Sequence, residues 1–248
     1  MHSRGIILAA GRGSRMKEET DSKPKCLTVL DGKELIEWQL LTLKAAGLVD
    51  LTVVGGYRSE MLTGDFELVK NNRWDDTNMV ASLFCVESVD KDSIISYSDI
   101  VYKTEHVLKL NEAKGDIVIT ADKKWKELWE LRFENPLDDA ETFKTINHKL
   151  IEIGKKTNDY GEIEAQYMGL LKFTPKGWSI MHDTFSSFPD EKKDKMDMTT
   201  MLNELLNKGT LITVVFIEGG WCEADAYTDI VAYEKALSNT KKWGHDWR

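Results

Sequence analysis

The stretch GIILAAGRGSRM, from Gly5 to Met16, constrains the fold more than any other part of the sequence. Ile6 to Leu8 form an apolar run without polar alternation, which is typical of a strand in a parallel sheet covered on both faces. The run ends in a loop with two glycines, which let the backbone approach a ligand and turn amide hydrogens towards it. The stretch therefore predicts an α/β fold in which a buried strand ends at a bound anion.

The following residues complete a strand–helix–strand unit. Leu35 to Ala46 carry apolar side chains at helical spacing, and Gly47 ends the predicted helix. Leu51 to Val54 are the next apolar run, which a right-handed crossover would place parallel to the first strand. The same patterns predict further strands at Ser93–Ser98, Asp116–Thr120, Leu170–Thr174 and Leu211–Ile217. They predict helices at Met79–Val89, Thr199–Asn207 and Thr228–Leu237. Exposed loops are predicted at Lys155–Gly161 and Pro189–Asp197.

Length and composition narrow the classes of protein. No repeat or low-complexity linker interrupts the 248 residues, so we expect a single α/β domain over residues 1–248. The net charge of -9 argues against a nucleic-acid partner, because phosphate backbones select basic surfaces. Three widely spaced cysteines fit a reducing cytoplasm, and no apolar run approaches the roughly 20 residues of a membrane span. We therefore expect a cytoplasmic protein that does not contact a membrane.

The glycine loop is rich in positive charge. Two interpretations of this loop are open. Its cations bind a polyphosphate, or they form a solvated basic turn whose charge is balanced by nearby acidic residues. A Walker A loop is excluded because no Gly-Lys-Ser/Thr closes it, and the dinucleotide fingerprint is excluded because Met16 replaces its third glycine. The cations are Arg12, Arg15, Lys23 and Lys25, and the acidic residues are Glu18, Glu19 and Asp21.

LAAGRGSRM followed by KPKCL resembles the signature of nucleotidyltransferases that make sugar-nucleotides and CDP-alcohols. The resemblance implies a single Rossmann-like, mixed and mostly parallel sheet flanked by helices. Residues 1–120 would then form a nucleotide-binding half, and residues 121–248 would bind the acceptor. Arg15 and Lys25 correspond to the catalytic cations of that family. The resemblance implies that a nucleoside triphosphate is bound by Leu8, Ala9, Ala10, Gly11, Gly13, Ser14, Arg15 and Lys25.

Two aspartates follow predicted strands and could reach one crevice at the carboxyl ends of the sheet. Asp99 comes after IISYS, and Asp225 lies in GGWCEADAYTDI. Taken alone, each aspartate fits a helix cap or a turn residue better than a metal ligand. The resemblance implies that Asp99 and Asp225 together hold Mg²⁺, and Glu223 would support them from the second coordination sphere.

Other segments resemble small cytidylyltransferases for phosphocholine, aminoethylphosphonate or phosphoglutamine. In NNRWDDTNMVASL, Asn78 and Ser82 would lie near the nucleobase, although Asn78 also suits a helix cap and Ser82 a buried position. NPLDDAETF and EIEAQYMGLLKF resemble the acceptor half of these enzymes. The acceptor residues implied are Lys155, Glu164 and Gln166.

The expected reaction joins CMP from CTP to a small phosphorylated or phosphonylated amine or amino acid, releases pyrophosphate and serves capsule or surface-polysaccharide modification. The acceptor phosphate is already anionic, so alignment and charge neutralisation suffice and no general base is needed. A sugar-1-phosphate nucleotidyltransferase, a metal-dependent glycosyltransferase and a non-catalytic nucleotide sensor stay open as alternatives. Asp99 lacks the Asp-x-Asp pattern usual in glycosyltransferases. A homodimer is one assembly that the sequence allows.

Overall fold

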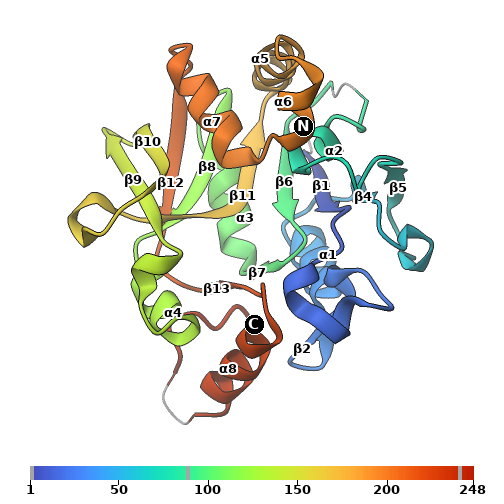
Figure 1. Cartoon of the computed structure of the whole chain (residues 1–248), viewed down its shortest axis with the longest axis vertical. Coiled ribbons are helices and arrows are strands. Elements are labelled where there is room, and N and C mark those ends of the chain that lie inside the picture. The colour runs from blue at the N-terminus through green and yellow to red at the C-terminus, as the bar shows by residue number, and fades with distance from the viewer. Residues whose placement is uncertain (1–2, 88–89, 240–241) are drawn as a thin grey trace.

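The strands of the central sheet alternate their side chains between two apolar layers. In β1 (Arg4–Ala9), Ile7 and Ala9 join one cluster of buried side chains, and Ile6 and Leu8 join another. Successive side chains of a strand point to opposite faces, so both faces of this strand are covered. The computed structural model in Figure 1 describes residues 3–87, 90–239 and 242–248.

Eight further strands join β1 in one mixed sheet within the described residues. They are β4 (Leu51–Gly55), β5 (Glu67–Lys70), β6 (Ser93–Tyr97), β8 (Ile117–Asp122), β9 (Glu141–Ile146), β10 (Lys149–Lys156), β11 (Gln166–Phe173) and β12 (Ile212–Ile217). Their order is β5-β4-β1-β6-β11-β8-β12-β10-β9. Only β11 and β10 run against the rest, which confirms the predicted mostly parallel α/β sheet.

Helices cover both faces of the sheet (Figure 1). One layer contains α1 (Leu35–Ala45), α3 (Thr104–Glu112), α4 (Trp125–Arg132) and α8 (Tyr227–Ser238). The other contains α2 (Met79–Leu83), α5 (Pro175–Ser186) and α7 (Met198–Asn207), with the short α6 (Asp190–Lys195) beside α2. Short 3-10 helices lie at Ser14–Thr20, Lys25–Leu27, Ser59–Met61, Pro136–Asp138 and Tyr160–Glu162.

A two-stranded ribbon connects the two halves of the chain. β7 (Ile100–Tyr102) pairs antiparallel with β13 (Trp221–Glu223), and the backbone N–H of Ala224 donates to the Asp99 carbonyl at 2.8 Å. The ribbon thereby places residues more than 100 positions apart beside each other at the carboxyl ends of the parallel strands. A second small pair, β2 (Val29–Leu30) and β3 (Lys33–Glu34), lies before α1.

The C-terminal segment packs next to the β7–β13 pair, below it in the view of Figure 1. Asp122, at the end of β8, accepts hydrogen bonds from Trp221 Nε1 and the Gly219 N–H, both at 2.8 Å. His245 Nε2 lies 3.0 Å from the same carboxylate, and His245 and Asp122 are both fully buried. Trp247 packs edge to face against Trp38 of α1. The last residues therefore connect the second half of the sheet to the first helix.

The predicted strands and helices are confirmed as elements, with shifted ends. β11 begins earlier than predicted, at Gln166, and α2 ends at Leu83 instead of continuing to Val89. Residues 88 and 89 of that predicted helix lie outside the described residues. The predicted loop Lys155–Gly161 is wrong at its start, because β10 continues to Lys156.

The predicted loop Pro189–Asp197 is also wrong, because it contains α6. Pro189 precedes the helix, acidic residues occupy its first turn and lysines its last, an order that complements the helix dipole. Its charge, which suggested an exposed loop, is instead arranged along one helix. None of the helices in the described part of the chain is both long and apolar enough to cross a bilayer.

Candidate active site

Two adjoining cavities open at the carboxyl ends of the strands, each with a volume of about 220 Å³. We call the first the glycine-loop cavity; its lining includes Leu8, Ala10, Gly11, Gly13, Arg15, Lys25, Asn78 and Ser82. We call the second the β9–β11 cavity; its lining includes Asp139, Glu141, Lys156, Gln166, Glu223 and Asp225. Arg15 and Tyr97 line both, so these two side chains stand at the boundary. Ala9 and Ser14, expected at the nucleotide, do not line either cavity.

Gly13 is needed where the glycine loop crosses Lys25. Its φ is +72°, and a Cβ there would lie 2.7 to 2.9 Å from carbons of the Lys25 side chain. Gly11 faces open space, with nothing within 4 Å of the place a Cβ would take. The loop therefore packs against Lys25 at Gly13 and leaves open space beside Gly11.

Lys25 bridges the two predicted metal-binding aspartates. Its Nζ lies 2.7 Å from Asp99 Oδ2 and 2.7 Å from Asp225 Oδ1, and its side chain is only 9% exposed. Burial disfavours the charged ammonium, but attraction by Asp99 and Asp225 outweighs it and raises the pKa of Lys25. The lysine is thus held as a buried cation between two carboxylates.

Arg15 approaches the same carboxylates from solvent. Its Nη2 lies 2.8 Å from Asp225 Oδ1, while its side chain stays 69% exposed. Asp225 is buried, so the pair is open to solvent on the arginine side, where the guanidinium can exchange the carboxylate for another anion. Arg15 is therefore free to turn towards an anion in either cavity.

A carboxylate cluster forms where the β7–β13 ribbon brings its ends together. Oxygens of Asp99, Asp225 and Glu223 lie within 4.8 Å of one another, so Glu223 is a full member of the cluster rather than a supporting group. Burial, and next the charge of Asp225, raise the pKa of Glu223 to about 8. The opposite holds at Asp225, where Lys25 overcomes the effect of burial and lowers the pKa.

The cluster fits a divalent cation. Asp99 Oδ1 is buried and accepts no hydrogen bond from any described residue. Carboxylate oxygens are the ligands that hard divalent cations prefer, and an orphaned buried oxygen is otherwise unfavourable. The three side chains therefore have the chemistry of a metal site.

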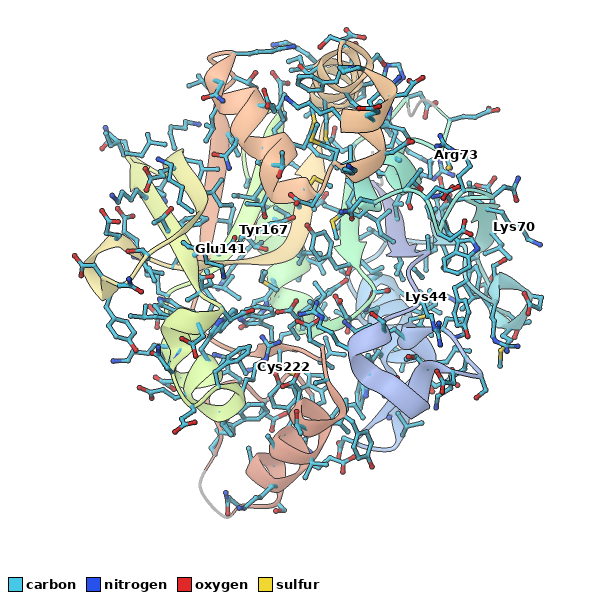
Figure 2. The ribbon with its side chains drawn as sticks, in the orientation of Figure 1. Lys44, Lys70, Arg73, Glu141, Tyr167 and Cys222 are labelled. Atoms are coloured by element: carbon cyan, nitrogen blue, oxygen red, sulfur yellow. The ribbon has the colours of Figure 1, made fainter. Side chains whose placement is uncertain are left out.

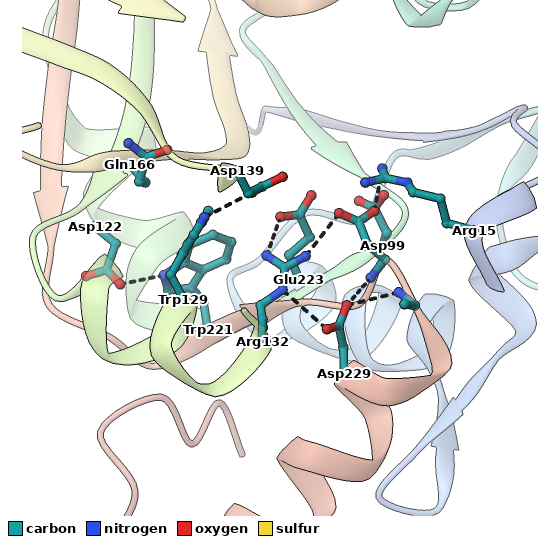
Figure 3. Close-up of polar contacts among 12 residues, drawn as sticks. Arg15, Asp99, Asp122, Trp129, Arg132, Asp139, Gln166, Trp221, Glu223 and Asp229 are labelled. Atoms are coloured by element: carbon teal, nitrogen blue, oxygen red, sulfur yellow. Dashed lines mark hydrogen bonds and ion pairs between the residues drawn. The ribbon is translucent and has the colours of Figure 1, made fainter. Parts of the chain in front are cut away.

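Arg132, which the sequence did not indicate, forms ion pairs with two members of this cluster, Glu223 and Asp225. It is the last residue of α4, and its side chain is 1% exposed. Its Nη1 lies 3.0 Å from Glu223 Oε2 and its Nη2 3.0 Å from Asp225 Oδ2, while Nε lies 3.5 Å from Asp229 Oδ1. Figure 3 shows the guanidinium reaching Glu223 and Asp229 from the same helix that carries Trp129. No motif marks an arginine whose partners lie about 90 residues later.

Asn78 and Ser82 line the glycine-loop cavity and also have structural bonds. Asn78 Oδ1 accepts from the Met79 N–H at 2.7 Å and so caps α2. Ser82 Oγ accepts from Asn71 Nδ2 at 3.0 Å. Both interpretations of these residues therefore apply: they build the local structure and face the cavity.

The three predicted acceptor residues lie in different surroundings. Gln166 lines the β9–β11 cavity, but its amide holds the backbone of Glu141. Lys155 Nζ instead pairs with Glu152 at 2.6 Å, and the Glu164 carboxylate accepts from Thr145. Neither Lys155 nor Glu164 lines this cavity; the lysine that does is Lys156.

The arrangement agrees with comparisons to known proteins. Residues 5–137, more than half of the chain, match the family model for the MobA-like NTP transferase domain. The chain is 41% identical over 244 residues to a CTP:phosphoglutamine cytidylyltransferase of Campylobacter jejuni, covering 91% of this chain and 96% of that protein. It is 35% identical over 101 residues to a choline-phosphate cytidylyltransferase of Streptococcus pneumoniae, covering 39% of this chain and 44% of that protein.

Solved structures agree on the fold. The inositol-1-phosphate CTP transferase of T. maritima superposes with a TM-score of 0.71 at 20% identity, covering 97% of this chain and 98% of that one. At this identity the likeness shows only that the two chains share a fold.

Proposed function

Because the chain belongs to the MobA-like NTP transferase family, we propose that it is a CTP-dependent cytidylyltransferase whose acceptor is a small phosphorylated amine or amino acid. The observation that carries the proposal is the junction of the two cavities. Arg15 borders both, and the Lys25–carboxylate cluster lies beside it. A nucleoside triphosphate in one cavity and an acceptor phosphate in the other would meet at these charges.

The reaction transfers a cytidylyl group between two phosphates. An oxygen of the acceptor phosphate attacks the α-phosphorus of CTP and forms a new P–O bond. The bond between the α-phosphorus and its bridging oxygen breaks, and the electron pair leaves with pyrophosphate. Because the attacking oxygen already carries charge, the protein contributes alignment and electrostatic stabilisation.

Lys25 and Arg15 would supply the positive charge that this reaction needs. Lys25 is held in place by Asp99 and Asp225 and faces the glycine-loop cavity, so its ammonium can donate to phosphate oxygens without reorganisation. Arg15, whose side chain is largely exposed, can exchange its ion pair with Asp225 for contacts with the phosphates. The expected catalytic pair thus combines one rigid cation with one mobile cation.

Mg²⁺ is the ion we propose for the carboxylate cluster. Asp99, Asp225 and Glu223 would hold it, and Arg132 keeps Glu223 and Asp225 in position. When bound, the ion would neutralise negative charge on the phosphates. The identity of the ion can be tested separately from turnover, by titrating the protein with Mg²⁺ or Mn²⁺ alone.

Three further features belong to this proposal. The first half of the chain, about residues 1–120, would bind CTP, and the second half, about 121–248, would bind the acceptor. The described cysteines are all free thiols, which suits a reducing compartment such as the cytoplasm. The product, a CDP-activated amine, would serve as a donor for capsule or surface-polysaccharide modification.

A pyrophosphate-release assay tests the proposal. The protein is mixed with each of four nucleoside triphosphates and a panel that contains phosphoglutamine, phosphocholine, aminoethylphosphonate and glucose 1-phosphate. We expect release with CTP and a phosphorylated amine. Faster release with glucose 1-phosphate would favour a sugar-phosphate nucleotidyltransferase, and no release with any pair would overturn the proposal.

A further inference from the structure

A β-bulge in β10 decides which of two neighbouring lysines faces the β9–β11 cavity. In a regular strand Ile153 and Lys155 would point to the same face, because alternate side chains share a face. Instead, β9 pairs Phe143 with Ile153 and Glu141 with Lys156, so an extra residue of β10 lies between the two pairs. Ile153 and Lys156 both line the cavity as a result, and the side chain of Lys155 is 67% exposed.

The bulge is built into the backbone. It contains Gly154, whose φ of +85° favours glycine, and a Cβ at this position would collide with the side chain of Thr199. The direction of Lys156 therefore follows from chain geometry and does not depend on a flexible side chain.

The second feature is a carboxylate without a hydrogen-bonding partner. The Gln166 amide accepts from the Glu141 N–H and donates to the Glu141 carbonyl, so the backbone of this residue is held. None of the described residues donates a hydrogen bond to the Glu141 carboxylate, which lines the cavity and lies near Tyr167 in Figure 2. Burial raises the pKa of Glu141, and the nearby Lys156 opposes this effect. A half-buried carboxylate of this kind is stabilised by a cation that donates hydrogen bonds.

Lys156 lies opposite Glu141 and retains donor capacity. Its Nζ donates to the Asp139 carbonyl at 2.8 Å and lies 3.4 Å from the Asp138 carbonyl. An ammonium has three hydrogens, so at least one is available to a ligand. The cavity thus presents a negative and a positive group on directly opposed residues.

Two of the four aromatic residues that line the cavity are closed to a quaternary ammonium. Trp129 is 3% and Phe143 is 1% exposed, so their faces are covered by protein, whereas Tyr97 and Tyr167 are half-buried and pack edge to face against each other. The Arg132 guanidinium lies 5.3 Å from the centre of the Trp129 ring, and the Trp129 N–H donates to Asp139 at 2.9 Å. Recognition of a trimethylammonium group relies on open aromatic faces. With only the two tyrosines partly open, the cavity offers mainly charged hydrogen-bonding groups.

We propose that the β9–β11 cavity recognises the head group of an α-amino acid, with Glu141 binding the ammonium and Lys156 binding the carboxylate. The inference rests on the proposed function, because it takes Arg15 and the carboxylate cluster as the place of the acceptor phosphate. It adds two specificity-determining residues and one substrate class: a phosphorylated amino acid rather than a phosphorylated choline.

Three acceptors test the two contacts separately. They are phosphoglutamine, its analogue without the α-carboxylate and its analogue without the α-amino group, and kcat/KM is measured for each with CTP. Each lost contact is a hydrogen bond to a charged group, so we expect each analogue to be roughly 10- to 100-fold poorer with the wild type. Phosphocholine should be poorer than phosphoglutamine by at least this factor.

Variants assign each preference to a residue. Glu141→Gln should abolish the preference for the amino group and keep that for the carboxylate, and Lys156→Met should do the reverse. Lys155→Met is the matched control, because Lys155 lies in the same strand but outside the cavity, and both preferences should persist. Ratios between acceptors within one variant do not depend on how much of the protein is folded.

Two results would overturn the inference and leave the proposed function standing. One is equal activity of the wild type with phosphoglutamine and both analogues. The other is preferences that survive in Glu141→Gln and Lys156→Met. Absence of pyrophosphate release with every acceptor would instead contradict the proposed function, so the two failures are distinct.

Discussion

The two cavities that meet at Arg15 hold their charges in different ways. In the glycine-loop cavity, Lys25 lies between Asp99 and Asp225 at 2.7 Å from each, so its charge is already paired. In the β9–β11 cavity, the Glu141 carboxylate has no donor among the described residues. One cavity therefore holds its buried cation paired before any ligand binds, and the other presents a carboxylate that a ligand of the right charge pattern can pair.

This difference suggests that one cavity serves catalysis and the other serves the choice of acceptor. A preorganised ion network stabilises charge that develops during reaction, whichever acceptor is present. Unpaired groups in the other cavity discriminate between acceptors, because a ligand that leaves them unpaired binds poorly. Changes at the first cavity should thus alter rates with all acceptors alike, and changes at the second should alter their ranking.

The largest effect is expected for Lys25→Ala. Removal of this cation should lower kcat by roughly 100- to 1,000-fold or more, because preorganised charge is lost where phosphate charge develops. The loss should be equal for all acceptors, while circular dichroism shows an intact fold. Lys44→Ala, which removes an exposed partner of Asp65, is the control. More than half of wild-type turnover at saturating substrate would remove Lys25 from the mechanism.

Asp99→Asn and Asp225→Asn should each weaken divalent-ion binding, on the order of 100-fold, since each loses a charged oxygen ligand. The measurement is a Mn²⁺ titration without nucleotide, followed by the Mg²⁺ dependence of turnover. Acceptor ranking should stay as in the wild type. Titrations of both variants that overlay the wild type would place the ion elsewhere.

The pH dependence of ion binding should reveal Glu223. Burial and the charge of Asp225 raise its pKa to about 8, so the carboxyl holds a proton below that pH and must release it to bind a cation. Ion affinity should therefore fall as the pH is lowered from 8 to 6, by roughly 10- to 100-fold for one competing proton. Glu223→Gln should flatten this dependence; an unchanged slope would exclude Glu223 as the titrating group.

A smaller effect is expected for Arg132→Lys. Lysine keeps the charge but not the planar fork that contacts Glu223 and Asp225 together. Ion affinity should fall by about 10-fold, as is usual when a group that orients metal ligands is changed. Because Arg132 acts through the cluster, kcat/KM should fall by a similar factor with every acceptor. A change in ranking instead would show that Arg132 serves the second cavity.

The smallest effect is expected for Glu164→Gln, which tests how far the β9–β11 cavity extends. Glu164 was expected to bind the acceptor, but its carboxylate accepts from Thr145 outside the cavity. Glu164→Gln should therefore change kcat/KM by less than about twofold for any acceptor, within the usual range of surface substitutions. A change in selectivity comparable to that of Glu141→Gln would show that the cavity extends to Glu164.

The same contrast explains what could be predicted from the sequence. The glycine loop and Lys25 lie within about 20 consecutive residues, so a local pattern could indicate them. Asp99 directly follows a predicted strand and Asp225 lies eight residues after one, and the resemblance was needed to pair them. Lys156 could not be found this way, because the resemblance indicated Lys155 and only the bulge at Gly154 turns the next lysine towards the cavity. Arg132 was missed because its partners are defined only by how α4 packs against the ribbon.

The position of Arg15 between the cavities has a consequence for the order of events. Under the proposed function, a phosphate that draws the Arg15 guanidinium away from Asp225 must break this ion pair, and the substrate that arrives first bears that free energy. The second substrate then meets a side chain that is already released. The proposed function therefore predicts that binding of the two substrates is coupled through one guanidinium, and linkage requires that each strengthens the other by the same factor. Kinetic synergy between triphosphate and acceptor would thus arise without movement of any helix or strand.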